Sequence, residues 1–470
     1  MGIMYKKVAV NRFVSDEFMR LDSKYRIFSD IERFEIWKDC NNIPLSKVLR
    51  EVNSTKVKKG ELEEEMPLVE LQNIERFSNN LVDVEFVKDV GSDKVVLNKG
   101  DIVIPKLEPR KGQFFLNINH NEYIGSSELI EYEINQKLCN PLWLYYLLVN
   151  DKLLAKLRNL ESGKAHQRVN PDDLLKVKIP NIPLPIQNEI VEQIKPIEQE
   201  ILALKKSKSS KLGIVHEVFN EEFGFDWESI TPLIENRKHI AKFTEIANDE
   251  LKFGVSLRLR YIFRHFIKPM PNIKWKALKK IVDVKGGKRL PKGEAVLEEE
   301  TDYKYIKVED LNWDGSFDIE NIKFISQANH EVIKQYIAET DDILLTIVGA
   351  TIGKCGLVPE ELSDENISEN FARLIIKDKN KWNPQYLCYA IMSKCSQFQI
   401  DEYTGKSSQG KLAIFRVNKI LIPDVDTDKQ MEIISRIEQR LYAQKEIDDK
   451  IESKRQEIGK LIESVIDNLG

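Results

Sequence analysis

The chain has 470 residues, which is too long for one ordinary hydrophobic core and predicts about two to four folded units. Apolar residues make up 42% of it and charged residues 31%, and this composition excludes an intrinsically disordered chain. The formal net charge of -5 excludes a surface that is basic throughout, so any contact with nucleic acid must come from local clusters of Lys and Arg.

Residues 1–182 are predicted to form a first domain of mixed α and β structure. Short runs rich in Val, Ile and Leu, such as residues 94–97 and 101–104, alternate with turn residues and indicate strands. Residues 141–160 are apolar at helical spacing and begin with proline, which is well tolerated in the first turn of a helix.

Residues 183–225 are predicted to form a long helix. Apolar residues recur along it at steps of four and three, which is typical of a coiled-coil seam: Ile190, Ile194, Ile197, Ile201 and Leu204. A short helix of this kind would pack on the core of its own domain. A helix over residues 185–223 would instead span about 58 Å at about 1.5 Å per residue, so it needs a partner along its whole length. Pro196 predicts a kink or local break.

After a linker over residues 226–254, the same order of segments returns. Residues 255–425 contain strand-like runs at 342–346 and 373–376 and are predicted to form a second mixed domain. Residues 426–470 are predicted to form a second long helix. Its apolar stripe includes Ile437, Leu441, Ile451, Ile458 and Val465.

The two halves match each other at a nearly constant offset, which lies between 239 and 243 residues. The segment 162–167 matches 404–409, and an Ile-Pro pair follows each segment, at 179–180 and 422–423. Further matches keep the same order: 100–104 with 341–345, 140–144 with 383–387, 188–194 with 431–437 and, weakly, 69–73 with 308–312. Chance explains one such match but not several collinear ones, so the chain is predicted to be a duplication. The expected fold class is α+β, with two mixed domains in tandem, each followed by a long helix, and the two helices packed as an antiparallel coiled coil.

Cysteine usage and the N-terminal sequence predict a protein of the reducing cytoplasm. The first ten residues lack the apolar core of a signal peptide, and no segment is apolar for long enough to cross a membrane. None of the five cysteines has metal-ligand spacing, and all are expected to be reduced thiols: Cys40, Cys139, Cys355, Cys388 and Cys395.

The order of a strand-rich domain, an Ile-Pro edge and a helix that opens with Leu-Pro-Ile-Gln-Asn-Glu-Ile-Val at 184–191, given twice, resembles the specificity subunits of Type I restriction-modification systems. In the second half, residues 286–293, 341–354 and 366–373 are similar to runs that recur in the target-recognition domains of that family. The first half departs from this pattern at 105–112 and 122–127, as expected if the two domains read different sequences.

This resemblance implies a non-catalytic protein of phage defence that binds double-stranded DNA. Each domain would read one half of a split target, and the two helices would act as a spacer and a docking surface. Two readers on one face of DNA must lie about 34 Å apart, or a multiple of it. The implied partners are two DNA methyltransferase subunits and, through them, restriction and translocase subunits, with no membrane contact. No cofactor is expected on this chain, whereas S-adenosylmethionine, ATP and Mg are expected on the partner subunits.

Loops that combine Gly with cationic and amide side chains are the candidate DNA contacts, because they can reach both phosphates and base edges. The alternative for each loop is an ordinary solvated surface. In the first half the candidates are Lys106, Arg110, Lys111, Lys164, His166, Gln167 and Arg168. In the second half they are Lys285, Lys288, Arg289, Lys292, Lys406, Ser407, Ser408, Gln409 and Lys411. His166 could also be a catalytic base, although no carboxylate or nucleophile is placed beside it in the sequence.

Motifs for catalysis are missing from the sequence. The three Asn-Pro pairs lack the second proline of a DNA methyltransferase turn, and neither a GxxxxGK[ST] phosphate loop nor an HExxH metal motif occurs. Two alternatives remain open. One is a stand-alone or phage-defence nuclease with an unrecognised metal site, and the other is a coiled-coil scaffold that binds only protein.

Overall fold

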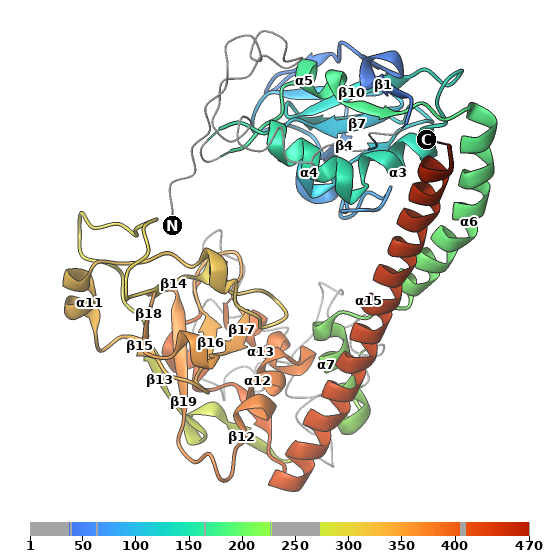
Figure 1. Ribbon diagram of the computed structural model, residues 1–470. Coiled ribbons are helices and arrows are strands. Elements are labelled where there is room, and N and C mark those ends of the chain that lie inside the picture. The colour runs from blue at the N-terminus through green and yellow to red at the C-terminus, as the bar shows by residue number, and fades with distance from the viewer. Residues whose placement is uncertain are drawn as a thin grey trace. The chain divides into compact units, whose positions relative to one another are not determined.

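The computed structural model describes residues 37, 40–62, 64–163, 166–225, 227, 273–404 and 410–469. The chain divides into two compact units, one made of Met1–Lys206 with Asp449–Gly470 and the other of Ser207–Asp448. The long helix α15 (Thr427–Leu469) is one continuous element that contributes residues to both units (Figure 1). The expected linker over residues 226–254 lies outside the described residues, except for Trp227.

The described part of the first unit contains three sheets with the strand orders β1-β11, β2-β10-β7-β8 and β3-β6-β9-β4-β5. Three of the four residues of β7 are Ile or Val, and all four are buried, as expected for the inner strand of a sheet that is covered on both faces. The strands are β1 (Asn42–Pro44), β2 (Leu49–Glu51), β3 (Lys56–Val57), β4 (Met66–Val69), β5 (Glu85–Val87), β6 (Lys94–Leu97), β7 (Ile102–Pro105), β8 (Phe115–Leu116), β9 (Tyr123–Ser126), β10 (Leu129–Ile134) and β11 (Lys178–Pro180).

Asparagine side chains start the three short helices of this unit. Asn140, Asn150 and Asn170 each accept hydrogen bonds from backbone N–H groups in the first turn, which satisfies donors that a helix leaves unpaired. The helices are α3 (Pro141–Leu148), α4 (Asp151–Leu160) and α5 (Pro171–Lys176), and α6 (Leu184–Lys206) follows β11.

The core of the first unit includes residues from both ends of the chain. Trp143 and the neighbouring side chains of α3 pack in one cluster with Ile190, Ile194 and Ile197 of α6. Ile458, Ile462 and Ile466 of α15 belong to the same cluster. The helix α6 therefore packs on its own domain and on α15 together.

The second unit repeats this architecture. Its four-stranded sheet has the order β13-β19-β16-β17, which is the order β2-β10-β7-β8 of the first unit, and β12 pairs with β20 as β1 pairs with β11. The remaining sheet is smaller, with the order β14-β18-β15. The strands are β12 (Trp275–Ala277), β13 (Val282–Gly286), β14 (Tyr305–Ile306), β15 (Ile337–Ala338), β16 (Ile343–Thr346), β17 (Cys355–Leu357), β18 (Glu365–Ile367), β19 (Phe371–Ile376) and β20 (Leu421–Pro423). The helices are α7 (Lys211–Phe223), α11 (Gln327–Ile333), α12 (Pro384–Met392), α13 (Lys394–Thr404) and α14 (Ile414–Val417).

A buried glutamine fixes the start of a long helix in each copy. The Gln187 amide donates to the carbonyl oxygens of Leu138 and Ile182, at 3.0 and 2.7 Å, and accepts from the N–H of Asn140 at 2.8 Å. Gln430 repeats this pattern in the second unit, where it bonds the backbone of residues 381, 383 and 425 at 2.8 to 3.0 Å. The predicted duplication and fold class are confirmed.

The predicted single helix over 185–223 is wrong. α6 continues through Pro196 without a break, and the helical structure is instead interrupted at residues 207–210. The Ser210 hydroxyl caps the start of α7 by accepting from the N–H of Gly213 at 3.0 Å. Serine competes with helical hydrogen bonding in this way, so the polar run before α7 stops one helix and starts another.

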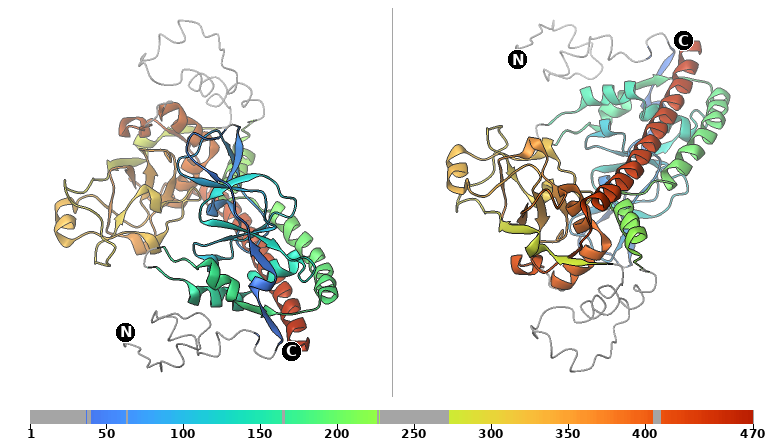
Figure 2. Two further views of the ribbon diagram at one scale, coloured as in Figure 1. Left: turned by 90° about the horizontal axis from the view of Figure 1, so that it is seen from above. Right: turned by 90° about the horizontal axis from the view of Figure 1, so that it is seen from below.

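The helix pairing is antiparallel in each unit. In the second unit, Arg436 pairs with Glu222 at 2.9 Å, and Lys208 pairs with Asp448 at 2.6 Å, so the residue numbers run in opposite directions. In the first unit, Lys454 of α15 pairs with Glu200 of α6 at 2.8 Å, and the ribbons of these two helices lie side by side (Figure 2). Ten residues were predicted to form the helix seam. Seven of them lie in the first unit, where each is buried or packs against its hydrophobic core, and two lie in the core of the second unit. The first group is Ile190, Ile194, Ile197, Ile201, Ile451, Ile458 and Val465, and the second is Ile437 and Leu441. Leu204 is half-buried.

The weak match of 69–73 with 308–312 is real but shifted by two residues. In the 3-10 helix Leu71–Asn73, the Asn73 side chain accepts from the N–H of Glu70 at 2.9 Å. In the 3-10 helix Val308–Asp310, Asp310 accepts from the N–H of Lys307 at 2.6 Å. Asn73 and Asp310 are therefore the equivalent pair. Among the described helices, none is apolar over a long enough stretch to span a bilayer.

Candidate nucleic-acid interface

Three loops meet beside the four-stranded sheet of the first unit. The N–H of Lys106, which follows β7, donates to the carbonyl oxygen of Glu128 at 2.8 Å, and the N–H of Val169 donates to that of Lys106 at 3.0 Å. Leu107 and Arg168 form a β-bridge. We call the described residues of these loops, 106–114, 127–128, 161–163 and 166–169, the first three-loop surface.

In the second unit, three loops meet through equivalent backbone hydrogen bonds and an equivalent β-bridge. The N–H of Ile347 donates to the carbonyl oxygen of Asn370 at 2.8 Å, and the N–H of Leu412 donates to that of Ile347 at 2.8 Å. Val348 and Lys411 form the equivalent bridge, so a cation occupies this bridge position in both copies. Residues 347–354, 368–370 and 410–412 form the second three-loop surface.

A glycine-rich segment joins the second surface. The N–H of Gly287 donates to the carbonyl oxygen of Phe371 at 3.2 Å, and that of Lys288 to Ile367 at 3.0 Å. A Cβ atom on Gly287 would lie 2.1 Å from the carbonyl oxygen of Ser368, which leaves room for glycine alone. This approach of the two backbones brings residues 288–292 beside the other loops.

Two predicted contact residues of the first half are tied into an ion-pair network. Arg110 pairs with Glu108 and with the fully buried carboxylate of Glu161, and it also donates to Gln167 at 2.9 Å. Lys111 pairs with Glu108 at 2.5 Å, and this hydrogen bond holds the pKa of the Glu108 carboxyl below its ordinary value. Arg110 and Gln167 therefore connect two loops of the surface.

The Arg168 guanidinium is paired with the carboxylate of Glu128. Its Nε and Nη2 atoms donate to the two oxygens of Glu128, each at 3.0 Å, and Nη1 donates to the carbonyl oxygen of His166 at 3.3 Å. The hydrogen bond from Arg168 lowers the pKa of Glu128 and raises that of Arg168. Lys106 and His166 lie in the same surface, and Lys164 falls outside the described residues.

The predicted cations of the second half are more open to solvent. Lys285, Lys292 and Lys411 are exposed. The Arg289 side chain is 80% exposed and pairs with Glu369 at 2.5 Å, and Lys288 Nζ lies 5.7 Å from the centre of the Tyr336 ring. The remaining predicted residues, Lys406, Ser407, Ser408 and Gln409, lie outside the described part of the chain.

Sequence reasoning missed the acidic members of both surfaces. Glu128 and Glu369 lie in the loops before β10 and β19, and each holds an arginine from a different loop. No local motif marks them, because each partner lies 40 or 80 residues away. With the adjoining residues 288–292 counted in the second surface, each surface thus contains an arginine–glutamate pair assembled by the fold.

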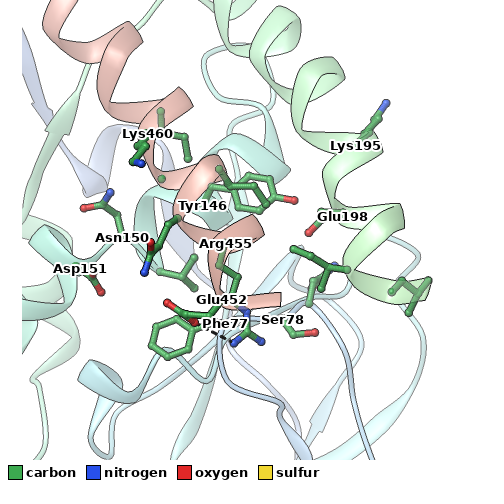
Figure 3. Close-up of a pocket in the computed structure, with 18 of the residues that line it drawn as sticks. Phe77, Ser78, Tyr146, Asn150, Asp151, Lys195, Glu198, Glu452, Arg455 and Lys460 are labelled. Atoms are coloured by element: carbon green, nitrogen blue, oxygen red, sulfur yellow. Dashed lines mark ion pairs between the residues drawn. The ribbon is translucent and has the colours of Figure 1, made fainter. Parts of the chain in front are cut away.

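The first unit also contains a cavity of about 670 Å³. Residues 77–80 and 149–151 line it together with α6 and the C-terminal part of α15 (Figure 3). Arg455 Nη1 lies 3.8 Å from Glu452 Oε2, and the guanidinium carbon of Arg455 lies 5.9 Å from the centre of the Phe77 ring. The residues that line it include both cations, such as Lys195 and Lys460, and carboxylates, such as Glu198 and Glu452. Within the described residues, no group of three or more His, Cys, Asp or Glu side chains could hold a metal ion.

Two copies of one mixed domain, each with a three-loop surface and an attached helix, define a duplicated protein with two structurally equivalent surfaces. The sequence pattern of the Type I restriction modification DNA specificity domain family matches residues 50–212 and 272–454. The chain belongs to this family, and the predicted resemblance is confirmed.

Individual relatives are more distant. The specificity subunit of the Type I restriction enzyme EcoBI of Escherichia coli is 26% identical over 164 residues, which is 34% of this chain and 33% of that protein. The match thus spans about a third of the relative's length. The crystal structure of the S subunit of a Type I restriction-modification system from M. genitalium covers 92% of this chain and 98% of its own, at 13% identity and a TM-score of 0.36. That of the HsdS subunit from Thermoanaerobacter tengcongensis covers 91% and 96%, at 16% identity and a TM-score of 0.31.

Proposed function

We propose that this chain is the DNA-sequence specificity subunit of a Type I restriction-modification system and reads a target made of two separated halves. Residues 1–182 and 255–425 are the two recognition domains, and residues 183–225 and 426–470 are the helical segments that follow them. The observation that carries the proposal is the repeated three-loop surface, with Arg168 and Lys411 at the same bridge position. Two equivalent surfaces suit a polymeric ligand that presents the same chemistry twice.

The arginine–glutamate pairs suggest how a base pair is read. A planar guanidinium can donate two hydrogen bonds to O6 and N7 of guanine, and a carboxylate can accept from N4 of cytosine. Glu128 holds Arg168 in one orientation before DNA binds, which reduces the entropy lost on binding. Exposed lysines such as Lys292 would neutralise phosphates and set the register.

This function leaves the chemistry to partners. DNA methyltransferase subunits, two in number, would dock on the paired helices, and restriction and translocase subunits would join through them. S-adenosylmethionine, ATP and Mg would bind those subunits, and this chain would be non-catalytic. The family match supports DNA specificity above a nuclease or a protein-only scaffold.

The salt dependence of DNA binding tests the proposal. Replacing both Lys288 and Arg289 by glutamine is expected to weaken duplex binding by the full chain. Because each phosphate contact contributes about 0.9 to the slope of log K against log salt concentration, the slope should fall by up to about 1.8. The matched control replaces Lys323 and Lys334 by glutamine; like Arg289 they are paired with carboxylates, but they lie outside both the second three-loop surface and the adjoining residues 288–292.

Two results would contradict the proposal. One is that wild type, the double variant and the control bind duplex DNA with the same affinity and the same salt dependence. The other is cleavage of plasmid DNA by the purified chain with magnesium alone, which would assign it a nuclease site of its own.

A further inference from the structure

A largely exposed aromatic side chain lies close in the chain to the second three-loop surface. Phe415, in the short helix α14, is 55% exposed. The Arg416 guanidinium lies 5.6 Å from the centre of its ring and Lys419 Nζ lies 5.9 Å from it. Two cations therefore lie close to the ring, and a ligand that covered it would remove apolar surface from water.

The charge around this ring differs between the two copies. Residues 410–419 carry three cations, Lys411, Arg416 and Lys419, and no carboxylate. The equivalent residues 167–176 carry two cations and two carboxylates, and Asp172 occupies the position of Phe415. In that copy Lys176 pairs with Asp173 at 3.2 Å. In this comparison the second copy combines an exposed ring with a segment whose charged residues are all cations.

The fold connects this ring to the candidate interface. α14 begins two residues after the bridge-forming loop, and a Cβ atom on Gly286 would lie 3.5 Å from Ile414 Cδ1. Exposed Lys285, on β13, therefore lies on the strand next to α14. The N–H of Lys279 also donates to the carbonyl oxygen of Asn418 at 3.1 Å, which adds another exposed lysine. The helix that carries Phe415 therefore lies beside two backbone segments that each carry an exposed lysine.

We infer that Phe415 makes a nonpolar contact with a base in the half of the target that the second domain reads. The inference rests on the proposed function and adds to it a specificity-determining residue. Phosphates cannot use an aromatic ring, so the ring's ligand must be an apolar part of DNA. The thymine methyl group in the major groove and the face of an unstacked base are the two available sources. The first domain, with Asp172 at this position, has no such contact.

Selection from a random duplex library tests this inference on the full chain. Wild-type protein should enrich a two-part motif, and F415A should lose base preference at one or two adjacent positions in one part only. Since a wrong base costs about 1 to 3 kcal/mol, discrimination there should fall about fivefold or more. F415L, which remains apolar, should retain part of the preference. F86A is the matched control, because Phe86 is 64% exposed but lies on the outer strand β5 of the first unit.

Replacing thymine by uracil in the affected part of the motif separates the two sources. A lost methyl contact should weaken wild-type binding about fourfold, from about 0.8 kcal/mol per buried methyl-sized group, and should leave F415A unchanged. Relaxed preference without a uracil effect would assign the contact to the face of a base. Both results support the inference.

Other outcomes overturn it. If wild type enriches a two-part motif and F415A enriches the same one, Phe415 does not read DNA although the proposed function stands. A uniform loss of affinity with unchanged preferences would also overturn it, as would failure of both F415A and F415L to fold. If wild type enriches no motif, the proposed function itself fails.

Discussion

Replacing Ile462 by alanine tests which unit the end of α15 stabilises. Ile462 is 1% exposed and packs in the core of the first unit, with Ile190 and Ile194 of α6 in the same cluster. Truncating a buried isoleucine to alanine costs about 2 to 5 kcal/mol, because apolar contact is lost and a cavity remains. The variant should therefore destabilise the first unit, although the substituted residue lies far from that domain in sequence.

Hydrogen exchange measured by mass spectrometry resolves this effect along the chain. A cost of about 2 kcal/mol raises the exchange rate of amides that open with the unit about 25-fold, at about 1.4 kcal/mol per tenfold. Peptides from α3 and α6 should lose this protection, whereas peptides from β16 and β19 should keep theirs. Ile433, which is fully buried in the second unit's core on the same helix, provides the matched control. I433A should produce the opposite pattern, and loss of protection in β16 and β19 on replacing Ile462 would refute the reasoning.

Three further substitutions follow from individual contacts. Replacing Gln430 by leucine leaves buried backbone groups without hydrogen bonds, which costs about 1 to 3 kcal/mol of folding free energy for each group. Calorimetry should therefore show the second unit melting at least about 2 °C lower. An unchanged melting temperature would show that Gln430 does not stabilise this unit. Burial raises the pKa of Asp310 from its ordinary 3.8 to about 6, so the unfolded chain loses this proton first and stability falls as pH rises between these values. D310N, which copies Asn73 of the first unit, should therefore gain stability over wild type by up to about 3 kcal/mol between pH 4 and 7 in urea titrations, and a gain independent of pH would exclude this cause. Replacing Gly287 by alanine would place Cβ 2.1 Å from a carbonyl oxygen, so it should displace residues 288–292 and weaken duplex binding at least as much as the Lys288 and Arg289 double variant; wild-type affinity would show that this loop is not part of the interface.

The duplication and fold class could be predicted because they depend on order and periodicity. The Ile-Pro pairs at 179–180 and 422–423 became β11 and β20, each paired with the first strand of its domain. Asn140 and Asn383, recognised only as matching positions, became caps of equivalent helices. A repeat reveals such positions without any knowledge of which strands pair.

The interruption at residues 207–210 could not be predicted from apolar spacing alone. The apolar stripe continues from Leu204 to Leu212, so its spacing gave no sign that the helix is interrupted between these residues. Ser210 before Lys211 is a helix-start signal, but partners from α15 also hold the break in place. The Gln444 side chain accepts from the N–H of Ser209 at 2.9 Å, and Asp448 pairs with Lys208. Contacts between residues about 235 positions apart cannot be predicted from the local sequence.

The candidate interface was predicted in part. Cationic loops stand out in the sequence, and the repeat brought Arg168 and Lys411 to attention. Whether a cation is free to bind DNA depends on carboxylates from other loops, and this could not be foreseen. Arg110 illustrates the difference, because its buried partner Glu161 lies 51 residues away. Phe415 was overlooked because a single aromatic residue in an apolar run looks like a core residue.

The sharing of α15 between the two units constrains how the protein is made on the ribosome. Ile466, which completes the first unit's core, follows Lys206 by 260 residues. At about 5 to 20 residues per second, the nascent first domain must wait roughly 13 to 52 s for this segment. During that time the apolar face of α6 lacks one of its covers, so a chaperone or a neighbouring nascent chain could occupy it first. Slow translation should therefore lower the yield of native protein more than its amino-acid composition would suggest.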